Sequence, residues 1–350
     1  MVMGVTMVSG AASFARPDAP SLQKLLEPIA AELHRVEMVL AEQPRGFEAR
    51  IGDYIQYVLG GVGKRLRPAL ALLTGGATGT IDERHVTLGV IVELIHVATL
   101  LHDDVLDEAR MRHGLPTSNS RWGNEISVLL GDCLFAHALR LAASYPTTTV
   151  CRRISEATNT VCSGEILQTQ RRFDVALGVE QYLDIINMKT GALFAVSCEL
   201  GALLNDSDPS MVERMREFGT NLGIAYQIYD DCVDIFGQER QAGKSLGTDM
   251  KTGKLTLPFL LLLQHTEATD RRELGEMIFR NEPSERSRLL RLATGNGVVA
   301  ESLLTIDRFI AAAEATLTDT SANVYSQTLS ALPSFVACRS RRLLKEGVAA

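Results

Sequence analysis

Apolar residues along the chain recur at the three- and four-residue spacing of amphipathic helices. Pro28 lies inside the first helical stretch and predicts a kink or restart there, because proline lacks the backbone N–H of a helix interior. Residues 266–287 are polar and contain a turn, and three further helices are expected after them, with breaks at residues 295–297 and 332–333. The helices expected before that turn cover residues 22–40, 48–59, 69–74, 86–101, 127–144, 152–170, 179–204, 211–236 and 255–265.

The pattern gives no sign of a half-buried β-sheet. No segment sustains the period-two alternation of a half-buried strand, no tandem repeat is present, and no linker rich in proline, glycine and serine separates the elements. The pattern therefore predicts a single all-α domain over residues 21–350. Residues 1–20 are expected to be a disordered lead-in and not a signal peptide, because no charged region precedes their weakly apolar part.

Composition agrees with this class and limits the partners. Hydrophobic residues make up 46% of the 350 and charged residues 22%, values typical of soluble globular proteins. The net charge of −7 argues against general nucleic-acid binding but allows a local basic pocket. The apolar run 259–263 is far shorter than the ~20 residues that span a bilayer. Six scattered cysteines without a CxxC pair indicate a reducing, cytoplasmic location.

An acidic motif, DDxxD, follows the apolar helix predicted over residues 86–101. Its first and last members, Asp103 and Asp107, lie four residues apart and therefore share one helix face. Carboxylates this close repel one another unless a cation lies between them, and Mg²⁺ prefers such oxygen ligands. A motif of this kind occurring alone is more often a solvated acidic helix end.

The same DDxxD spacing recurs at the end of the helix predicted over residues 211–236, as Asp230, Asp231 and Asp234. Two such motifs in one helical chain are difficult to explain as solvated faces. They could face each other across a bundle core, where helical proteins build metal and cofactor sites.

Basic residues stand in glycine-containing segments near both motifs. The first segment is not a Walker loop, because Arg65 occupies the position that a Walker loop gives to serine or threonine. Carboxylates and cations together suit a polyanion bridged by Mg²⁺. The alternative is a set of ordinary exposed loops and one lysine whose charged end reaches the core edge. The cations are Lys64, Arg67, Lys189, Lys244 and Lys254.

In combination and in order, the motifs resemble those of the trans-polyprenyl diphosphate synthases. The resemblance runs from about residue 22 to the C-terminus. It implies one bundle of long helices around a deep central cavity, usually a homodimer, that condenses isopentenyl diphosphate with an allylic diphosphate. The matching segments are GKRLRP, ELIHxATLLHDDVLDEAxMR, GNEISVLLGDCLF, GEILQ, KTGALF, YQIYDDCVDIFG and GKSLGTDMKTGKLTLP.

The resemblance also implies roles for single residues, with three Mg²⁺ ions bound between the two acidic motifs. The metal ligands would be Asp103, Asp107, Asp230 and Asp234, with Asp104 and Asp231 as supporting carboxylates. The residues that bind isopentenyl diphosphate would be Lys64, Arg67 and His96. Those that bind the allylic diphosphate would be Arg112, Lys189 and Lys254, with Lys244 as a further substrate contact. Thr190 and Gln227 would lie near the developing carbocation.

One position departs from the family pattern. Family members usually carry two adjacent arginines after the first acidic motif, and here the pair is Arg112 and His113. Histidine donates fewer hydrogen bonds than arginine and is largely neutral at pH 7. Either His113 is a weaker ligand of isopentenyl diphosphate, or Arg110 takes over that role. The glycine pair usual before Lys64 is also altered, to Val62 and Gly63.

Product length depends on the helix before the first acidic motif. Ala98 and Thr99 lie five and four residues before Asp103, where the resemblance places the cavity floor. Both are small, and the segment is most similar to long-chain synthases, so a product longer than C20 is expected. The floor could instead lie at Glu93 or Leu94, or on a neighbouring helix. Such a hydrophobic product could bring the enzyme into peripheral contact with a membrane.

Four other functions share some of these features. A C15–C20 synthase shares all the motifs, whereas a terpene cyclase would not need Lys64, Arg67 and His96. A di-iron bundle would use the ExxH pair of Glu93 and His96, but a second ExxH is absent from the sequence. A non-catalytic partner subunit would be expected to lose the acidic motifs, and both are intact.

Overall fold

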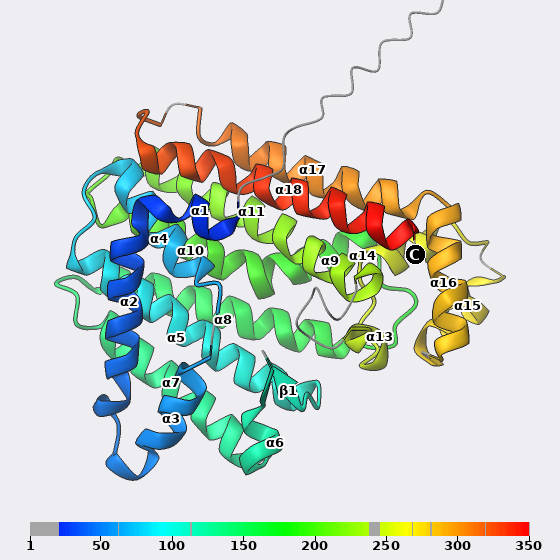
Figure 1. Ribbon diagram of the computed structural model, residues 1–350, viewed down its shortest axis with the longest axis horizontal. Helices are drawn as coiled ribbons and strands as arrows, with labels where there is room; N and C mark the ends of the chain where they lie inside the picture. Colours follow the sequence, from blue (N-terminus) through cyan, green and yellow to red (C-terminus); the bar gives the residue numbers. More distant parts are fainter. Residues whose placement is uncertain are drawn as a thin grey trace, which may run out of the picture.

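The computed structural model of the protein describes residues 21–61, 63–112, 114–237, 246–267, 269–280, 282–318 and 320–349. Within these ranges the chain is helical apart from turns and one short hairpin, so the expected all-α class is confirmed (Figure 1). The lead-in 1–20, together with His113 and Lys244, lies outside the described residues.

The N-terminal part follows the predicted helices closely. The expected restart at Pro28 is present as a 3₁₀ turn, Glu27–Ile29, between the first two helices. The helices are α1 (Leu22–Leu25), α2 (Ala30–Glu42), α3 (Gly52–Leu59), α4 (Leu66–Thr78) and α5 (Glu83–Leu106), with further 3₁₀ turns at Gln43–Gly46 and Ala49–Ile51.

The middle of the chain contains the hairpin and the longest helices. Strands β1 (Met111–Arg112) and β2 (Leu115–Pro116) pair in antiparallel fashion, with Met111 opposite Pro116. A π-helical turn, Asn187–Gly191, interrupts the helix expected over 179–204 and carries residues of the predicted site. The helices are α6 (Ser118–Trp122), α7 (Asn124–Ala142), α8 (Thr148–Gln170), α9 (Val179–Ile186), α10 (Ala192–Leu203) and α11 (Pro209–Phe236).

Two expectations for the C-terminal part are wrong. Helix α15 lies in the polar segment 266–287, where no helix was expected, because Leu274, Met277 and Ile278 form a narrow buried face on it. Pro333 lies inside α18 and does not end it; burial of apolar side chains on both sides of Pro333 offsets the one lost N–H bond. The helices are α13 (Thr248–Lys251), α14 (Leu257–Gln264), α15 (Arg271–Arg280), α16 (Pro283–Gly295), α17 (Val298–Ala315) and α18 (Val324–Ala349).

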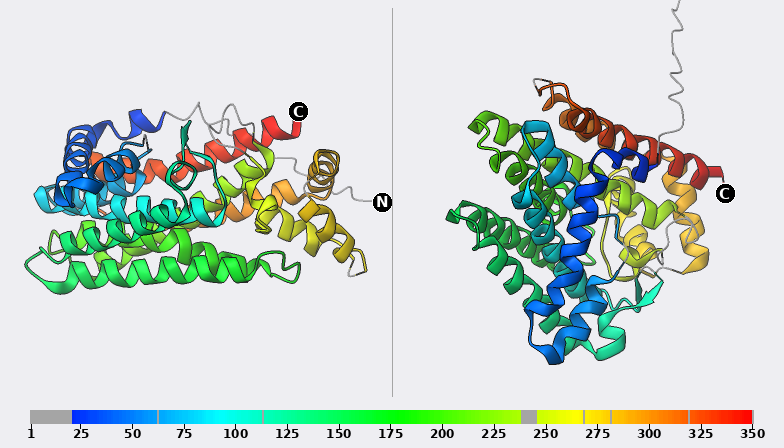
Figure 2. Two further views of the ribbon diagram at one scale, coloured as in Figure 1. Left: turned by 90° about the horizontal axis from the view of Figure 1, so that it is seen from below. Right: turned by 60° about the vertical axis from the view of Figure 1, so that its left-hand side comes forward.

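Helix α10 lies at the centre of the packing and contacts α4, α5, α8 and α11. Glycines allow the closest approaches. A Cβ on Gly201 would lie 2.0 Å from Thr74 Oγ1 on α4, and one on Gly219 of α11 would lie 2.5 Å from the Phe194 carbonyl oxygen. The helices stack in layers, with α18 on the opposite side of the molecule from α8 (Figure 2). A larger residue at either glycine would force these layers apart.

Helix α5 is, among the described helices, the one long and apolar enough to cross a membrane by length and composition. No such segment was expected from the sequence. In the structure, 72% of that apolar stretch is buried inside the protein, as in a core helix. The carboxyl ends of α5 and α11 reach the same end of the bundle, next to α13 (Figure 1). The two acidic motifs are therefore brought to one region.

Candidate active site

The first acidic motif forms the end of α5, where its three carboxylates have two different environments. Asp103 lies in the last turn and Asp107 caps the helix, and both side chains keep partial exposure. Asp104 points the other way and is 3% exposed. The expectation that Asp103 and Asp107 share a face is consistent with this division, and Asp104 belongs to the interior.

Asp104 is held by Arg112 of the hairpin. The guanidinium donates Nε at 3.0 Å and Nη2 at 2.7 Å to Asp104 Oδ1. Burial raises the pKa of Asp104, and the bond to Arg112 opposes that rise. Asn119 donates to the Asp104 backbone carbonyl at 3.0 Å, which ties α6 to the same point. Arg112, expected to bind the allylic diphosphate, therefore links the hairpin to the end of α5 in this structure through its hydrogen bonds to Asp104.

Asp107 is the meeting point of two cations. Lys254 Nζ lies 2.6 Å from Oδ2, and Arg172 Nη2 lies 2.9 Å from Oδ1. Arg172 also donates to the Leu106 carbonyl at 3.2 Å. Lys254 was predicted from the sequence, whereas Arg172 was missed. The signal for it was weak, a basic pair after α8 that looks like an ordinary exposed loop.

Asp103 is paired with Lys189, which the π-helical turn presents to the site. Lys189 Nζ lies 3.7 Å from Asp103 Oδ2, contacts Glu165, and donates to Gln168 Oε1 at 3.0 Å. Burial alone would lower the pKa of Lys189, but the carboxylates of Asp103 and Glu165 raise it above its usual value. Lys189 thus stays cationic. Its partners Glu165 and Gln168 belong to the GEILQ segment, but the sequence did not single out either residue.

The second acidic motif contains two buried carboxylates and one half-buried carboxylate. Asp234, 2% exposed, accepts from Thr248 Oγ1 at 3.2 Å and from the Asp249 N–H at 3.3 Å, and so holds the start of α13. Asp231 accepts from Gln227 Nε2 at 2.8 Å and from the Tyr182 hydroxyl at 2.6 Å. Asp230 is half-buried on α11.

The donor set suits a hard divalent cation. The two motifs offer carboxylate oxygens, which Mg²⁺ and Ca²⁺ prefer, and partial exposure leaves room at Asp103, Asp107 and Asp230. Within the described part of the chain, histidine, cysteine and acidic side chains do not gather in a group of three or more that would hold an ion by itself. Such a site fits ions shared with substrate oxygens better than a cage made by protein alone.

The arginine side chains at the start of α4 point in different directions. Arg65 adopts a left-handed backbone conformation, φ 48°, and pairs with buried Glu93 at 2.6 Å. Arg67 stacks over the Phe194 ring at 5.0 Å, and burial lowers its pKa. Glu93, one of the alternative floor positions, is thus engaged by Arg65. His96 is half-buried on α5.

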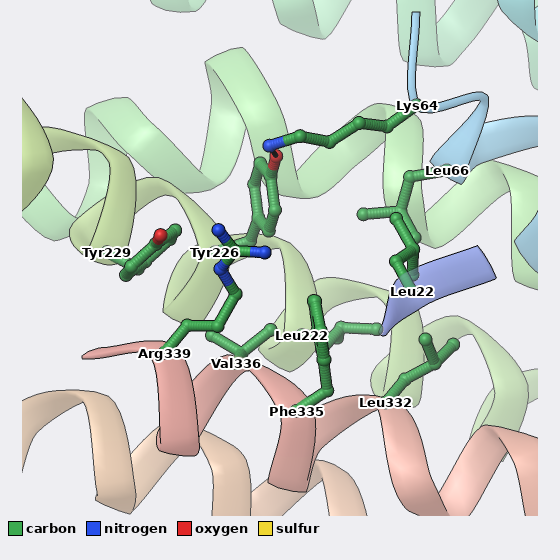
Figure 3. Close-up of a pocket in the computed structure, with 10 residues that line it drawn as sticks. All are labelled: Leu22, Lys64, Leu66, Leu222, Tyr226, Tyr229, Leu332, Phe335, Val336 and Arg339. Carbon is green, nitrogen blue, oxygen red and sulfur yellow. Dashed lines mark hydrogen bonds between the residues drawn. The ribbon is translucent and has the colours of Figure 1, made fainter. Parts of the chain in front are cut away.

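Lys64 reaches the edge of a pocket between α1, α4, α11 and α18. Its ammonium donates to the Tyr226 hydroxyl at 3.3 Å. Leucine, phenylalanine and valine side chains form most of the wall, and Arg339 of α18 extends toward Tyr226 and Tyr229 (Figure 3). Lys64 was predicted from the sequence, and Arg339 was not.

The two residues expected to set product length differ in exposure. Ala98 is 0% exposed and fully inside the core. Thr99 is half-buried and donates its hydroxyl to the His96 carbonyl at 2.7 Å. Neither carries a bulky side chain.

Comparison with known proteins gives one consistent result. Residues 48–293 match the family described as Polyprenyl synthetase. The octaprenyl diphosphate synthase of Escherichia coli is 36% identical over 245 residues, which cover 70% of this chain and 76% of that protein.

Solved structures agree. A decaprenyl diphosphate synthase from Rhodobacter capsulatus superposes with a TM-score of 0.84 at 31% identity, covering 91% of this chain and 98% of that one. A polyprenyl synthase from Caulobacter crescentus, complexed with calcium and isoprenyl diphosphate, gives a TM-score of 0.86 at 31% identity, covering 92% and 99%.

Proposed function

The chain belongs to the polyprenyl synthetase family, and we propose that this prenyltransferase condenses isopentenyl diphosphate head-to-tail with an allylic diphosphate to an all-trans product longer than C20. The observation that carries the proposal is the convergence of both acidic motifs with Lys189 and Lys254 at one end of the bundle. Carboxylates and buried cations together are what a metal-bound diphosphate requires.

Family members use divalent metals, and the Caulobacter crescentus relative was crystallised with calcium. For this chain we propose three Mg²⁺ ions held by Asp103, Asp107 and Asp230, with Asp234 and the remaining acidic residues in support. When bound, the ions stabilise the negative charge that develops on the departing diphosphate. The partial exposure of the first two carboxylates supports this assignment.

The protein's own residues then divide the substrates between them. Lys189, Lys254 and Arg172 lie beside Asp103 and Asp107 and are proposed to neutralise the allylic diphosphate. Thr190 and Gln227 are proposed to lie near the developing carbocation, and the apolar core around α5 and α10 would exclude water from it. The proposed ligands of isopentenyl diphosphate are Lys64, Arg67 and His96.

A long-chain product is supported by two features. Ala98 and Thr99 are small, and the octaprenyl and decaprenyl synthases are similar over most of the chain. The test is to incubate the protein with Mg²⁺, labelled isopentenyl diphosphate and farnesyl diphosphate, and to size the products. No elongation with any allylic primer would overturn the synthase proposal and leave a terpene cyclase as the alternative. Products that stop at C15 or C20 would replace the long-chain proposal with a short-chain one.

Ala98→Phe is expected to shorten the product by at least one five-carbon unit, because a ring at this position would take room from the product cavity proposed beside α5. Overpacking of this buried position should also cost ~1–3 kcal/mol of stability. Product sizing on a reversed-phase column measures the effect. Ala313→Phe on α17 is the control, since Ala313 is equally buried but lies on a different helix from the first acidic motif. Unchanged product length in Ala98→Phe would locate the floor elsewhere.

Arg172→Met is expected to raise the KM for the allylic diphosphate and lower kcat/KM about tenfold. This is the lower end of what a hydrogen bond to a charged group contributes, ~1.5–3 kcal/mol. The adjacent variant Arg171→Met is the control, because Arg171 pairs with Asp174 at 2.8 Å and does not reach Asp107. Steady-state kinetics at saturating isopentenyl diphosphate separate the two. If Arg172→Met and Arg171→Met have the same KM and kcat/KM, Arg172 does not bind the allylic diphosphate.

We further propose one domain over residues 21–350, a homodimer and a cytoplasmic location. Exposed apolar side chains on the packed helices α7 and α8 support the dimer, among them Leu129 and Ile166. The free state of all six cysteines supports a reducing compartment. Light scattering should give the mass of two chains. Peripheral contact with a membrane would come through the product.

A further inference from the structure

We propose that Tyr182 is a positioning residue that acts through Asp231 and Gln227 to orient the hydroxyl of Thr190. In this orientation the oxygen of Thr190, and not its proton, faces the reacting carbocation. The inference rests on the proposed function, because the place of Thr190 beside the carbocation comes from it. Tyr182 itself was not singled out by the sequence.

Four side chains from three elements form a continuous chain of hydrogen bonds. The Tyr182 hydroxyl of α9 donates to Asp231 Oδ2 at 2.6 Å. Gln227, one turn earlier on α11, donates Nε2 to Asp231 Oδ1 at 2.8 Å. Thr190, in the π-helical turn, donates Oγ1–H to Gln227 Oε1 at 2.6 Å. The relay thus joins α9, the turn that carries Lys189, and the second acidic motif.

Burial protects these hydrogen bonds from competition with water. Tyr182 is 2% exposed, Thr190 5% and Asp231 6%, so water competes poorly for any of them. Burial, and then the charge of Asp231, raise the pKa of Tyr182 well above its ordinary value. The phenol therefore keeps its proton at neutral pH and is the donor in its hydrogen bond to Asp231.

The chemistry of the groups fixes the direction of the relay. A carboxylate accepts only, so Gln227 must turn its NH₂ group toward Asp231. Its carbonyl oxygen is then left for Thr190, and a carbonyl oxygen can only accept. The single hydroxyl proton of Thr190 is consequently committed to Gln227. What Thr190 can offer to a neighbouring cation is oxygen lone pairs, which stabilise positive charge.

Tyr182 matters because the arrangement has two orientations. An amide can rotate by half a turn and exchange its donor and acceptor ends. With Tyr182 bound to one oxygen, the Asp231 carboxylate keeps its other oxygen aimed at Gln227. Without that bond the carboxylate can rotate, Gln227 can turn its NH₂ toward Thr190, and the Thr190 proton is free to point at the cation. The π-helical turn, a feature often found at functional sites, holds Thr190 within reach of the relay.

A double-mutant cycle tests this role. Tyr182→Phe keeps the ring and removes the hydroxyl, and it should lower kcat about tenfold with the KM for the allylic diphosphate unchanged within about twofold. Thr190→Val removes the end of the relay at constant size. If Tyr182 acts through Thr190, adding Tyr182→Phe to Thr190→Val should change kcat by less than about twofold. Tyr145→Phe is the matched control, because its hydroxyl donates to the Arg84 carbonyl at 2.5 Å, outside the relay.

The outcomes separate the possibilities. Equal losses of kcat in the wild-type and Thr190→Val backgrounds would show a purely structural tyrosine and overturn the inference, as would unaltered kcat in Tyr182→Phe. If Tyr182→Phe does not fold, Tyr182→Met replaces it in the cycle, since it also lacks the hydroxyl that donates to Asp231. A wild-type protein without any elongation activity would instead refute the proposed function, and the inference with it.

Discussion

Asp107→Asn is expected to lower kcat by about 10²–10³, the loss that follows removal of one preorganised electrostatic group from an active site. Asp107 accepts from both Lys254 and Arg172, and it is one of the proposed metal ligands. Asparagine keeps the size of the side chain and removes its charge. The substitution then removes a proposed metal ligand, and it leaves Lys254 and Arg172 without the negative charge that they contact.

Steady-state kinetics across a range of Mg²⁺ concentrations measure this effect. A second readout is independent of turnover: Mg²⁺ with a diphosphate should raise the unfolding temperature of the wild type and do so less in Asp107→Asn. Asp307→Asn is the control. Asp307 forms an exposed pair with Arg341 at 2.8 Å on α17 and α18, so its loss should leave kcat unchanged. An Asp107→Asn enzyme with near-normal kcat would show that this carboxylate is not a metal ligand.

Arg112→Met is expected to lower the free energy of unfolding by about 3 kcal/mol at pH 7–8. Breaking a buried ion pair leaves a buried charge without its partner and costs ~3–5 kcal/mol. The lower end applies here, because 37% of the Arg112 side chain is exposed, whereas Asp104 is nearly covered. Chemical denaturation measures the loss. Arg110→Met, at an exposed position of the same segment, should change stability by no more than ~0.5 kcal/mol.

The loss should also depend on pH, with a definite sign. Burial raises the pKa of Asp104 above 3.8 in the folded protein, and removal of Arg112 takes away the interaction that opposes that rise. A carboxyl group whose folded pKa is raised favours the folded state at low pH, and this stability is lost as pH rises through the folded pKa. The Arg112→Met variant should therefore approach the wild type near pH 4 and fall behind it toward neutral pH. A difference that is constant between pH 4 and 8 would contradict the buried-carboxylate explanation.

Much of the helical architecture followed from local pattern. Apolar periodicity located α5, α8 and α11, because long amphipathic helices repeat their signal over many turns. It failed at α15, where charged residues hide a narrow buried face, and at Pro333, where packing on both sides of the proline outweighs one missing bond. Both failures are cases in which tertiary contacts override local preference.

By itself the sequence determined the two acidic motifs and their relation to the helix ends. Spacing of four residues places Asp103 and Asp107 on one face whatever surrounds them. Only the tertiary structure decided which side chains contact them. Arg172, Lys254 and Tyr182 reach their carboxylates across 65, 147 and 49 residues of chain. Such contacts depend on how α9, α11 and the loops pack, and no local periodicity records that packing.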